Sequence, residues 1–317
     1  MKMGAMFSRA PIDTQPYDEF AAFADLATEM GIPADRVPTG RRVTHTRASG
    51  QQLSCLQWGE GEPEFVFLHG GGQNAHTWDA VVLLLGRPAL AIDLPGHGHS
   101  DRRADRDYGP WSNAEAAADV IAALAPKAKV VSGMSLGGAT NIRLTADHPE
   151  LVRRAVIIDV SPQVNDPSRP FTPEQRGSVA LVAGPPTYES YEAMAEAAVS
   201  MSPLRAPEAV RRGVRHNSLR REDGTWIWRY DLFRGADEPD LTATWRDFTT
   251  LWDDVSRIAV PTMLVVGGVS VYVQPSDIDE FRRRLPDVRV ETVEGAGHAV
   301  QSDQPAALVR LLEDWAT

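Results

Sequence analysis

The stretch that most constrains the fold is residues 130–138, which read VVSGMSLGG. Two β-branched residues precede a Gly-x-Ser-x-Gly pattern, and the residues after it favour a helix. This pattern is typical of a nucleophile elbow, a tight strand-to-helix turn that holds a serine hydroxyl above the edge of a sheet. Side chains at Gly133 and Gly137 would collide with neighbouring backbone as the turn closes. Ser135 is therefore a candidate nucleophile, although a plain glycine-rich turn would also explain these residues alone.

The length and the charge of the chain restrict what it can be. Its 317 residues suffice for one large domain, or for a core domain with an insertion. A formal net charge of −11 argues against nucleic acid or an anionic membrane surface as a partner, because both bind basic patches. The longest purely apolar run, residues 80–85, is too short to span a membrane.

Cysteine usage and the first residues suggest a compartment. Cys55 is the only cysteine, so neither an intramolecular disulfide nor a cysteine metal cluster can form. Residues 1–13 lack the sustained apolar run of a secretory signal. A reducing, cytoplasmic location is the simplest interpretation.

Patterns of buried strands alternate with helical patterns on both sides of the Ser135 turn. Strands are expected at residues 64–68, 89–93, 129–131, 154–159, 262–266 and 288–293. Helices are expected at residues 78–85, 112–124 (with Ser112 as the N-cap), 135–147, 276–285 and 305–315. Continuous apolar strands with helical connectors predict an α/β fold, in which a mostly parallel central sheet carries helices on both faces.

The remaining segments predict two additions to this core. A helix at residues 17–30 precedes a hairpin at 42–58, and the alternation of strands and helices stops between residues 161 and 254. We therefore expect an N-terminal helical extension at 1–40, a core at 41–160 and 255–317, and a cap or lid insertion at 161–254. Helical patches lie at 188–199 and 207–217 of the insertion.

Aromatic residues gather near the end of the insertion. They are Trp226, Trp228, Tyr230 and Phe233. Such side chains would line an acyl or alcohol pocket, since ligand sites are mostly apolar and aromatic. They could equally form the small hydrophobic core of the cap itself.

A serine hydroxyl is a weak nucleophile at neutral pH and needs a positioned base. His298 lies in the run EGAGH at 294–298, directly after the last expected strand, and we predict it to be this base. The other histidines carry less specific signals. We expect structural roles in loops or surface positions for His69, His97, His99, His45 and His148, whereas His76 and His216 could face the pocket.

An oxyanion hole requires backbone N–H groups that point at the developing negative charge. One should come from Leu136, the residue after the nucleophile. The second should come from the loop HGGGQ at residues 69–73, where the missing side chains let the backbone approach a substrate. We predict Gly71 as this donor, with Gly72 in reserve. Neither a G-x-G-x-x-G spacing nor a phosphate-binding lysine follows, so a nucleotide site is not indicated.

These motifs, taken together in their order, resemble the α/β-hydrolase superfamily. The resemblance spans roughly residues 42–317 and is carried by residues 69–72, 93–100, 133–137 and 297–298. More closely, the runs at 69–79 and 297–303 are similar to those of actinobacterial, mycobacterial-type serine esterases. The resemblance implies a carboxylic ester hydrolase with a helical cap.

The acid of the triad departs from the pattern of the family. Most of the superfamily carry an aspartate after the strand that here is 262–266, but this position holds Ser270, which cannot stabilise an imidazolium as a carboxylate does. Asp159 ends the preceding strand, and some members of the superfamily place the acid there. Asp277 is the alternative, although it is expected to open a helix, where a carboxylate often caps the N-terminus. We favour Asp159, which could otherwise simply cap a turn.

The sequence thus predicts transfer of an acyl group from a small-molecule ester of small to medium chain length to Ser135 and then to water. This chemistry needs neither a metal nor an organic cofactor. The residues expected to contact the substrate are Gly72, His76, Trp226, Trp228 and Tyr230. A lactonase, a C–C bond hydrolase, a menaquinone-pathway lyase and a catalytically silent binding protein remain alternatives, because a fold does not fix its chemistry. The sequence does not determine the oligomeric state.

Overall fold

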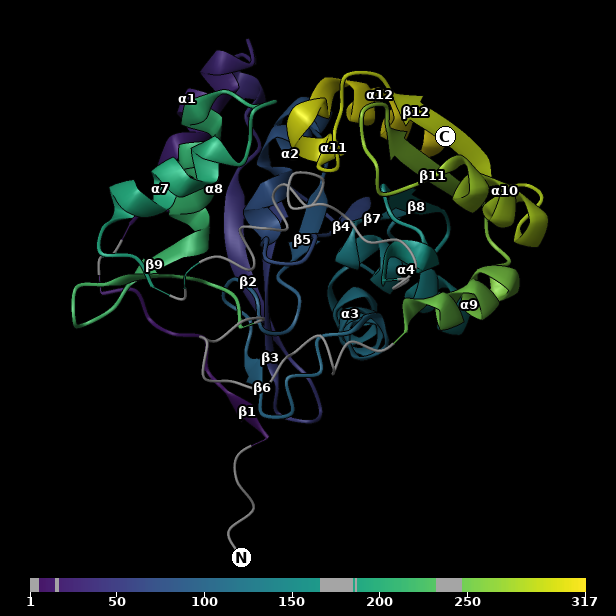
Figure 1. Cartoon of the computed structure of the whole chain (residues 1–317), viewed down its shortest axis with the longest axis horizontal. Coiled ribbons are helices and arrows are strands. Elements are labelled where there is room, and N and C mark those ends of the chain that lie inside the picture. Colours follow the sequence, from purple (N-terminus) through teal and green to yellow (C-terminus); the bar gives the residue numbers. More distant parts are fainter. Residues whose placement is uncertain (1–5, 15–16, 166–184, 186, 232–246) are drawn as a thin grey trace, which may run out of the picture.

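The computed structural model describes residues 6–14, 17–165, 185, 187–231 and 247–317. Its centre is an eight-stranded sheet with the strand order β12-β11-β8-β7-β4-β5-β3-β2 (Figure 1). The strands are β2 (Gly40–Thr46), β3 (Gln52–Trp58), β4 (Phe65–Leu68), β5 (Ala89–Ile92), β7 (Val130–Met134), β8 (Ala155–Ile158), β11 (Thr262–Gly267) and β12 (Arg289–Val293). Only β3 runs antiparallel to its neighbours, β2 and β5. The predicted α/β-hydrolase fold with a mostly parallel sheet is confirmed.

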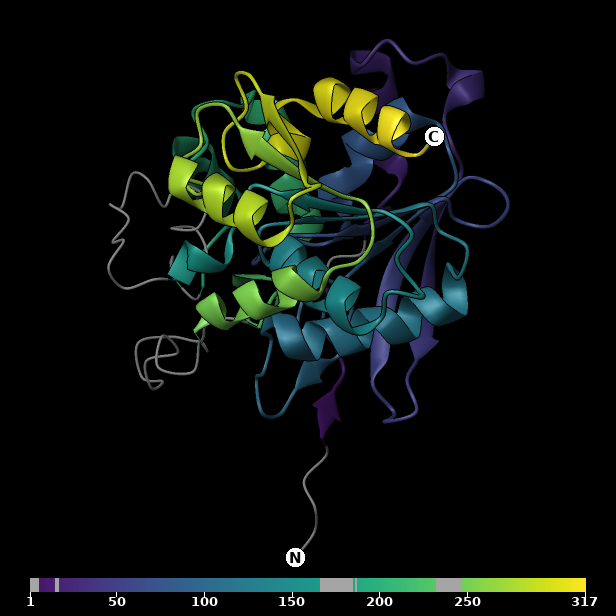
Figure 2. The same ribbon diagram turned by 90° about the vertical axis from the view of Figure 1, so that its right-hand side faces the viewer.

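Helices cover both faces of this sheet, as Figure 2 shows edge-on. One face packs against α1 (Ala21–Glu29), α2 (Asp79–Leu85) and α12 (Pro305–Trp315). The other packs against α3 (Pro110–Leu124), α4 (Leu136–Asp147), α9 (Leu251–Arg257) and α10 (Pro275–Arg284). The short helix α11 (Val300–Asp303) precedes α12. The strands between these layers are buried on both sides, which explains their continuous apolar sequences.

Helix α3 begins earlier than the sequence predicted. It starts at Pro110, with Gly109 at the N-cap, because a proline at the first helical position has a suitable φ and needs no amide partner. The expected N-cap, Ser112, instead donates its hydroxyl to the carbonyl of Asp107 at 2.7 Å. The prediction of a serine cap was therefore wrong.

In its described residues, the segment between β8 and α9 contains the helices α7 (Tyr191–Ser200) and α8 (Pro207–Asn217) and a small hairpin. The two helices pack on the hairpin of β9 (Ser218–Arg220) and β10 (Trp226–Trp228). Their shared core is formed by Tyr188, Met194, Ala195, Ala198, Val210, Val214 and Trp226. Helix α8 lies beside α1 (Figure 1), and Arg212 of α8 pairs with Glu29 of α1 at 2.9 Å.

The remaining elements are short. They are the strands β1 (Phe7–Ser8) and β6 (Arg102–Arg103), which pair with each other, and the 3-10 helices at Ala34–Arg36, Ala75–Trp78, Pro162–Asn165 and Phe248–Thr250. In the part of the chain described, no helix combines the length and the apolar character that crossing a bilayer requires.

Arg42 of β2 connects the N-terminal segment to the core. Its guanidinium lies 2.6 Å from the carboxylate of Glu19 and 2.8 Å from that of Asp93. Asp93 is fully buried, and its oxygens also accept the amides of Ala75 and His99. Burial opposes the charge of Asp93, but the nearby Arg42 lowers the pKa of this carboxyl below its ordinary value. Arg42 and the two amides together stabilise the charge of this buried carboxylate.

We predict that Arg42→Ala lowers the free energy of unfolding by about 3 kcal/mol, because it leaves a buried carboxylate without its counter-ion. The control is Arg41→Ala on the same strand. Its exposed side chain donates to Gln57, and the change should alter stability by no more than about 0.5 kcal/mol. Urea unfolding followed by circular dichroism measures both. Equal midpoints for the two variants would show that the pair with Asp93 contributes little.

Candidate active site

The candidate site lies at the edge of the sheet where the parallel strands end. Ser135 follows β7, Asp159 follows β8 and His298 comes after β12. The glycine-rich loop at 69–73 follows β4, the neighbour of β7. Because parallel strands end at one edge, four segments far apart in sequence meet there.

Ser135 occupies a strained turn. Its backbone has φ 52° and ψ −118°, a conformation that costs a non-glycine residue about 1–3 kcal/mol and is found mostly at functional sites. A Cβ at Gly133 would lie 2.1 Å from the carbonyl oxygen of Gly137, and one at Gly137 would lie 2.2 Å from that of Leu68. The turn therefore closes only with glycine at both positions. The amide of Ser135 donates to the carbonyl of Ile158 at 3.0 Å, which fixes the turn to β8.

Asp159 is in direct contact with His298. Its Oδ2 lies 2.7 Å from His298 Nδ1, and its side chain is fully buried whereas that of His298 is 10% exposed. The same carboxylate accepts the hydroxyl of Ser270 at 2.5 Å and the amide of Gly267 at 2.9 Å. The carboxylate is thereby held by two donors from the end of β11 while it faces the imidazole.

Two residues near His298 were not predicted as part of the site. Ser270 entered the sequence argument only as the missing acid, and no pattern indicated that its hydroxyl reaches Asp159. The ring of Tyr272 stacks on the imidazole of His298, with centroids 3.8 Å apart and planes 22° apart. No motif singled out Tyr272.

Asp277, the alternative acid, lies elsewhere. It is the third residue of α10, and its Oδ2 accepts the amide of Gln274 at 3.0 Å in a reciprocal capping box. Its side chain is buried at the start of this helix. The structure brings Asp159, and not Asp277, to His298.

The glycine-rich loop is held by two buried histidines. His97 Nε2 accepts the amide of Gly72 at 3.1 Å, and His69 Nε2 accepts that of Leu94 at 2.9 Å. Burial lowers the pKa of His97 to about 3 and also lowers that of His69, so both rings are neutral. The amide of Gly72 therefore already donates a hydrogen bond within the protein. Over the described ranges we find no acceptor for the amides of Gly71 and Leu136.

A cavity of about 230 Å³ opens beside Ser135. Gly71, Gly72 and His298 contribute to its wall, as do Leu26 of α1 and Val210 of α8. Of the aromatic residues expected to contact a substrate, Trp228 and Tyr230 line this cavity. Trp226 does not, because it packs in the core of α7, α8 and the hairpin. Phe233 lies outside the described residues.

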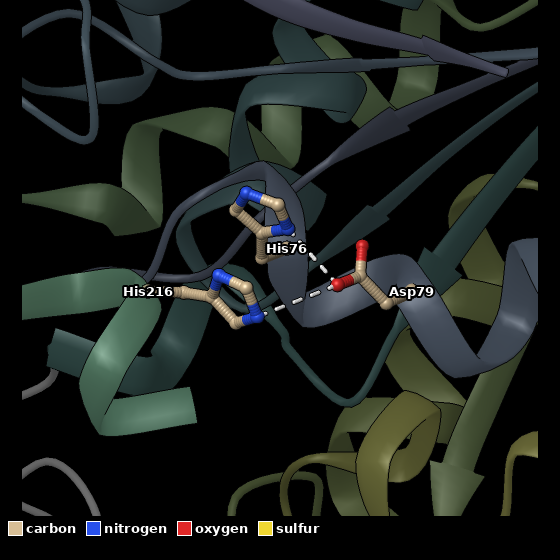
Figure 3. Close-up of side chains that lie close together, drawn as sticks. All are labelled: His76, Asp79 and His216. Atoms are coloured by element: carbon tan, nitrogen blue, oxygen red, sulfur yellow. Dashed lines mark hydrogen bonds and ion pairs between the residues drawn. The ribbon is translucent and has the colours of Figure 1, made fainter. Parts of the chain in front are cut away.

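Another part of the cavity wall carries a cluster of buried polar residues, shown in Figure 3. His76 Nδ1 lies 2.9 Å from Asp79 Oδ2, and His76 Nε2 lies 3.2 Å from Glu19. Burial disfavours the charge of His76, but these carboxylates raise its pKa to about 9. His216 stacks on His76 with ring centroids 3.8 Å apart, and burial together with this neighbour holds the pKa of His216 well below its usual value.

Known proteins resemble this chain in sequence and in structure. The chain is 46% identical to the esterase Rv0045c of Mycobacterium tuberculosis over 296 residues, which cover 93% of this chain and 94% of that protein. It is 30% identical to the sn-1-specific diacylglycerol lipase ABHD11 of Mus musculus over 251 residues, 77% of each chain. A solved structure of the M. tuberculosis esterase, from work on its inhibition by transition metals, has a TM-score of 0.81 and 45% identity, and covers 95% of this chain and 99% of that one.

The model of the alpha/beta hydrolase family matches residues 65–311, from β4 into α12. This range includes the Ser135 turn, Asp159 and His298. Together with the relative that is 46% identical over nearly the whole chain, the match shows that this protein belongs to the alpha/beta hydrolase family.

Proposed function

We propose that the protein hydrolyses carboxylic esters through an acyl-enzyme intermediate on Ser135. The observation that carries the proposal is the 2.7 Å contact between the buried carboxylate of Asp159 and His298 Nδ1. Ser135 and His298 line the same cavity, where the nucleophile and the base could act on one substrate. Serine hydrolysis requires these three groups: a nucleophile, a base that takes its proton, and an acid that orients the base. The names of the esterase and lipase relatives support the same activity.

In the proposed mechanism His298 removes the proton from the hydroxyl of Ser135 as this oxygen attacks the ester carbonyl. The alcohol departs with a proton returned by His298, and the acyl group remains on Ser135. A water molecule, deprotonated by the same base, then attacks the acyl carbon. The bond to Ser135 breaks, His298 returns the proton to the serine oxygen, and the acid is released. Asp159 keeps the imidazole in the required tautomer and stabilises the imidazolium.

The negative charge on the carbonyl oxygen needs donors that are already in place. The amides of Gly71 and Leu136 are proposed for this role, because each is without an acceptor in the described part of the chain. The bond from Gly72 to His97 supports this choice over Gly72, since it fixes the loop and engages that amide. His97 is thus proposed to position the loop.

The size of the cavity suggests the class of substrate. At about 230 Å³ it lies below the range of about 300–1,000 Å³ that is typical of sites for drug-sized ligands. Its wall combines small residues such as Ala198 and Gly213 with the aromatic Trp228 and Tyr230. We therefore propose esters with small to medium acyl chains as substrates.

We predict that the wild-type protein hydrolyses p-nitrophenyl esters with a preference for short to medium acyl chains. Ser135→Ala should lower kcat by about 10⁴-fold or more, because the nucleophile is lost. A fluorophosphonate probe should label the wild type at Ser135 and leave the variant unlabelled. Hydrolysis that persists in Ser135→Ala, or labelling at another residue, would contradict the mechanism.

We predict that Asp159→Asn lowers kcat by about 10⁴-fold with little change in fold, because an amide favours the wrong tautomer of His298. Asp277→Asn is the matched control, since this residue caps α10, and it should retain wild-type kcat while losing some stability. Steady-state kinetics and thermal unfolding distinguish the two effects. The reverse pattern of kcat values would assign the acid to Asp277.

A further inference from the structure

Three potential metal ligands meet where the segment after β8 touches the core. His76 and Asp79 lie on the turn that leads into α2, and His216 lies near the end of α8 (Figure 3). We propose that His76, Asp79 and His216 bind one divalent transition-metal ion of the Zn²⁺ class, which links α8 to α2. This site uses neither Ser135, Asp159 nor His298, although its three residues line the same cavity as Ser135.

The geometry fits a small ion after modest movement. His76 Nδ1 lies 2.9 Å and His216 Nε2 lies 3.9 Å from Asp79 Oδ2, and the three ligand atoms lie within 4.8 Å of one another. Ligands about 2.0–2.2 Å from a tetrahedral Zn²⁺ are about 3.3–3.6 Å apart. The two rings, now stacked with planes 15° apart, must turn so that both nitrogen lone pairs point at the ion. Ligation by Nδ1 releases the proton that His76 shares with Asp79.

The donor set selects the metal. Two imidazole nitrogens and one carboxylate oxygen suit Zn²⁺, Co²⁺, Ni²⁺ and Cu²⁺, whereas Mg²⁺ and Ca²⁺ prefer oxygen ligands. Three protein ligands leave the fourth position of a tetrahedral ion for water. All three residues line the cavity, which provides a path for the ion to enter.

The surroundings of the three residues also match a metal site. Glu19 lies 3.2 Å from His76 Nε2, so it can accept the N–H opposite the ligating nitrogen, as carboxylates commonly do behind metal-bound histidines. Asp79 Oδ1 and His216 Nδ1 are buried without a hydrogen-bond partner in the described part of the chain. Neither of these atoms is a proposed ligand atom, but a cation at Oδ2 would offset the cost of burying the carboxylate of Asp79.

The test measures metal binding and does not depend on hydrolysis. Tag-free Ser135→Ala protein, stripped with a chelator, is titrated with Zn²⁺ by calorimetry, and with Co²⁺ by visible absorption. We expect one equivalent bound. The further change His216→Ala removes a ligand and should weaken binding by at least about 100-fold. Glu19→Gln weakens the hydrogen bond behind the ligand His76 and should weaken binding by about 10-fold. Normal binding with no esterase activity in the wild type would refute only the proposed function.

His148→Ala is the matched control, because His148 sits near two acids, Glu115 and Glu150, but on the surface. It should bind Zn²⁺ as the parent does. Should His216→Ala fold poorly by circular dichroism, His216→Gln replaces it, and Zn²⁺ should raise the thermal midpoint of the parent but not of this variant.

A crystal structure grown with Zn²⁺ provides the direct observation. It should show the ion between His76 Nδ1, Asp79 Oδ2 and His216 Nε2, with the two rings no longer stacked. Unchanged affinity in both His216 variants, loss of binding in His148→Ala alone, or an ion bound only elsewhere would each overturn the proposal.

Discussion

The buried carboxylate of Asp159 is the contact on which the arrangement of the site depends. It accepts from the amide of Gly267, from the hydroxyl of Ser270 and from His298 Nδ1, so it joins the ends of β8 and β11 to the loop after β12. A fully buried charge is tolerated only when its acceptor capacity is used. Asp159 has a positive φ of 50°, and Ser135, at the end of the neighbouring strand, has a φ of 52°. The surrounding parallel strands keep both turns in these strained backbone conformations.

Acidic residues of the N-terminal segment attach the cavity wall to the core. Asp13 pairs with Arg229 at 3.0 Å, and Glu29 pairs with Arg212 at 2.9 Å. Glu19 lies between Arg42 of the sheet and His76 beside the cavity. Since Arg212 lies on α8 and Arg229 follows β10, these ion pairs contribute to the position of the cavity wall that these elements form.

Most of the fold was predictable because it is encoded locally. The strands β4, β5, β8 and β11 are short apolar runs, and helical patterns alternate with the strands of the core. The elbow at Gly133–x–Ser135–x–Gly137 specifies a strand, a turn and a helix within nine residues. The choice of Asp159 followed from the end of a predicted strand, and the structure places its carboxylate at His298. The division into extension, core and cap remains a prediction.

Contacts between residues that are distant along the chain could not be predicted from the sequence. Trp226 and Trp228 are two positions apart on one strand and therefore share a face of the hairpin, so the strand pattern does not distinguish them. Their tertiary neighbours do, because Trp226 packs in the core with α7 and α8 whereas Trp228 reaches the cavity. His76 and His216 meet only because α8 folds back over the turn into α2, and no local spacing encodes that approach. The stacking of Tyr272 on His298 is likewise a tertiary contact.

The register of two strands explains why the proposed acid, Asp159, can follow β8 when the position after β11 holds Ser270. In the parallel pair of β8 and β11, Ile158 lies opposite Val265, and the amide of Asp159 donates to the carbonyl of Val265. The residues that follow these strands therefore emerge side by side beneath the loop of His298, and a carboxylate from either strand can face Nδ1. Here Ser270 occupies the second position and donates its hydroxyl to the carboxylate supplied by the first. A hydroxyl cannot stabilise an imidazolium, but it can hold the carboxylate that is proposed to do so, which makes Ser270 part of the same arrangement.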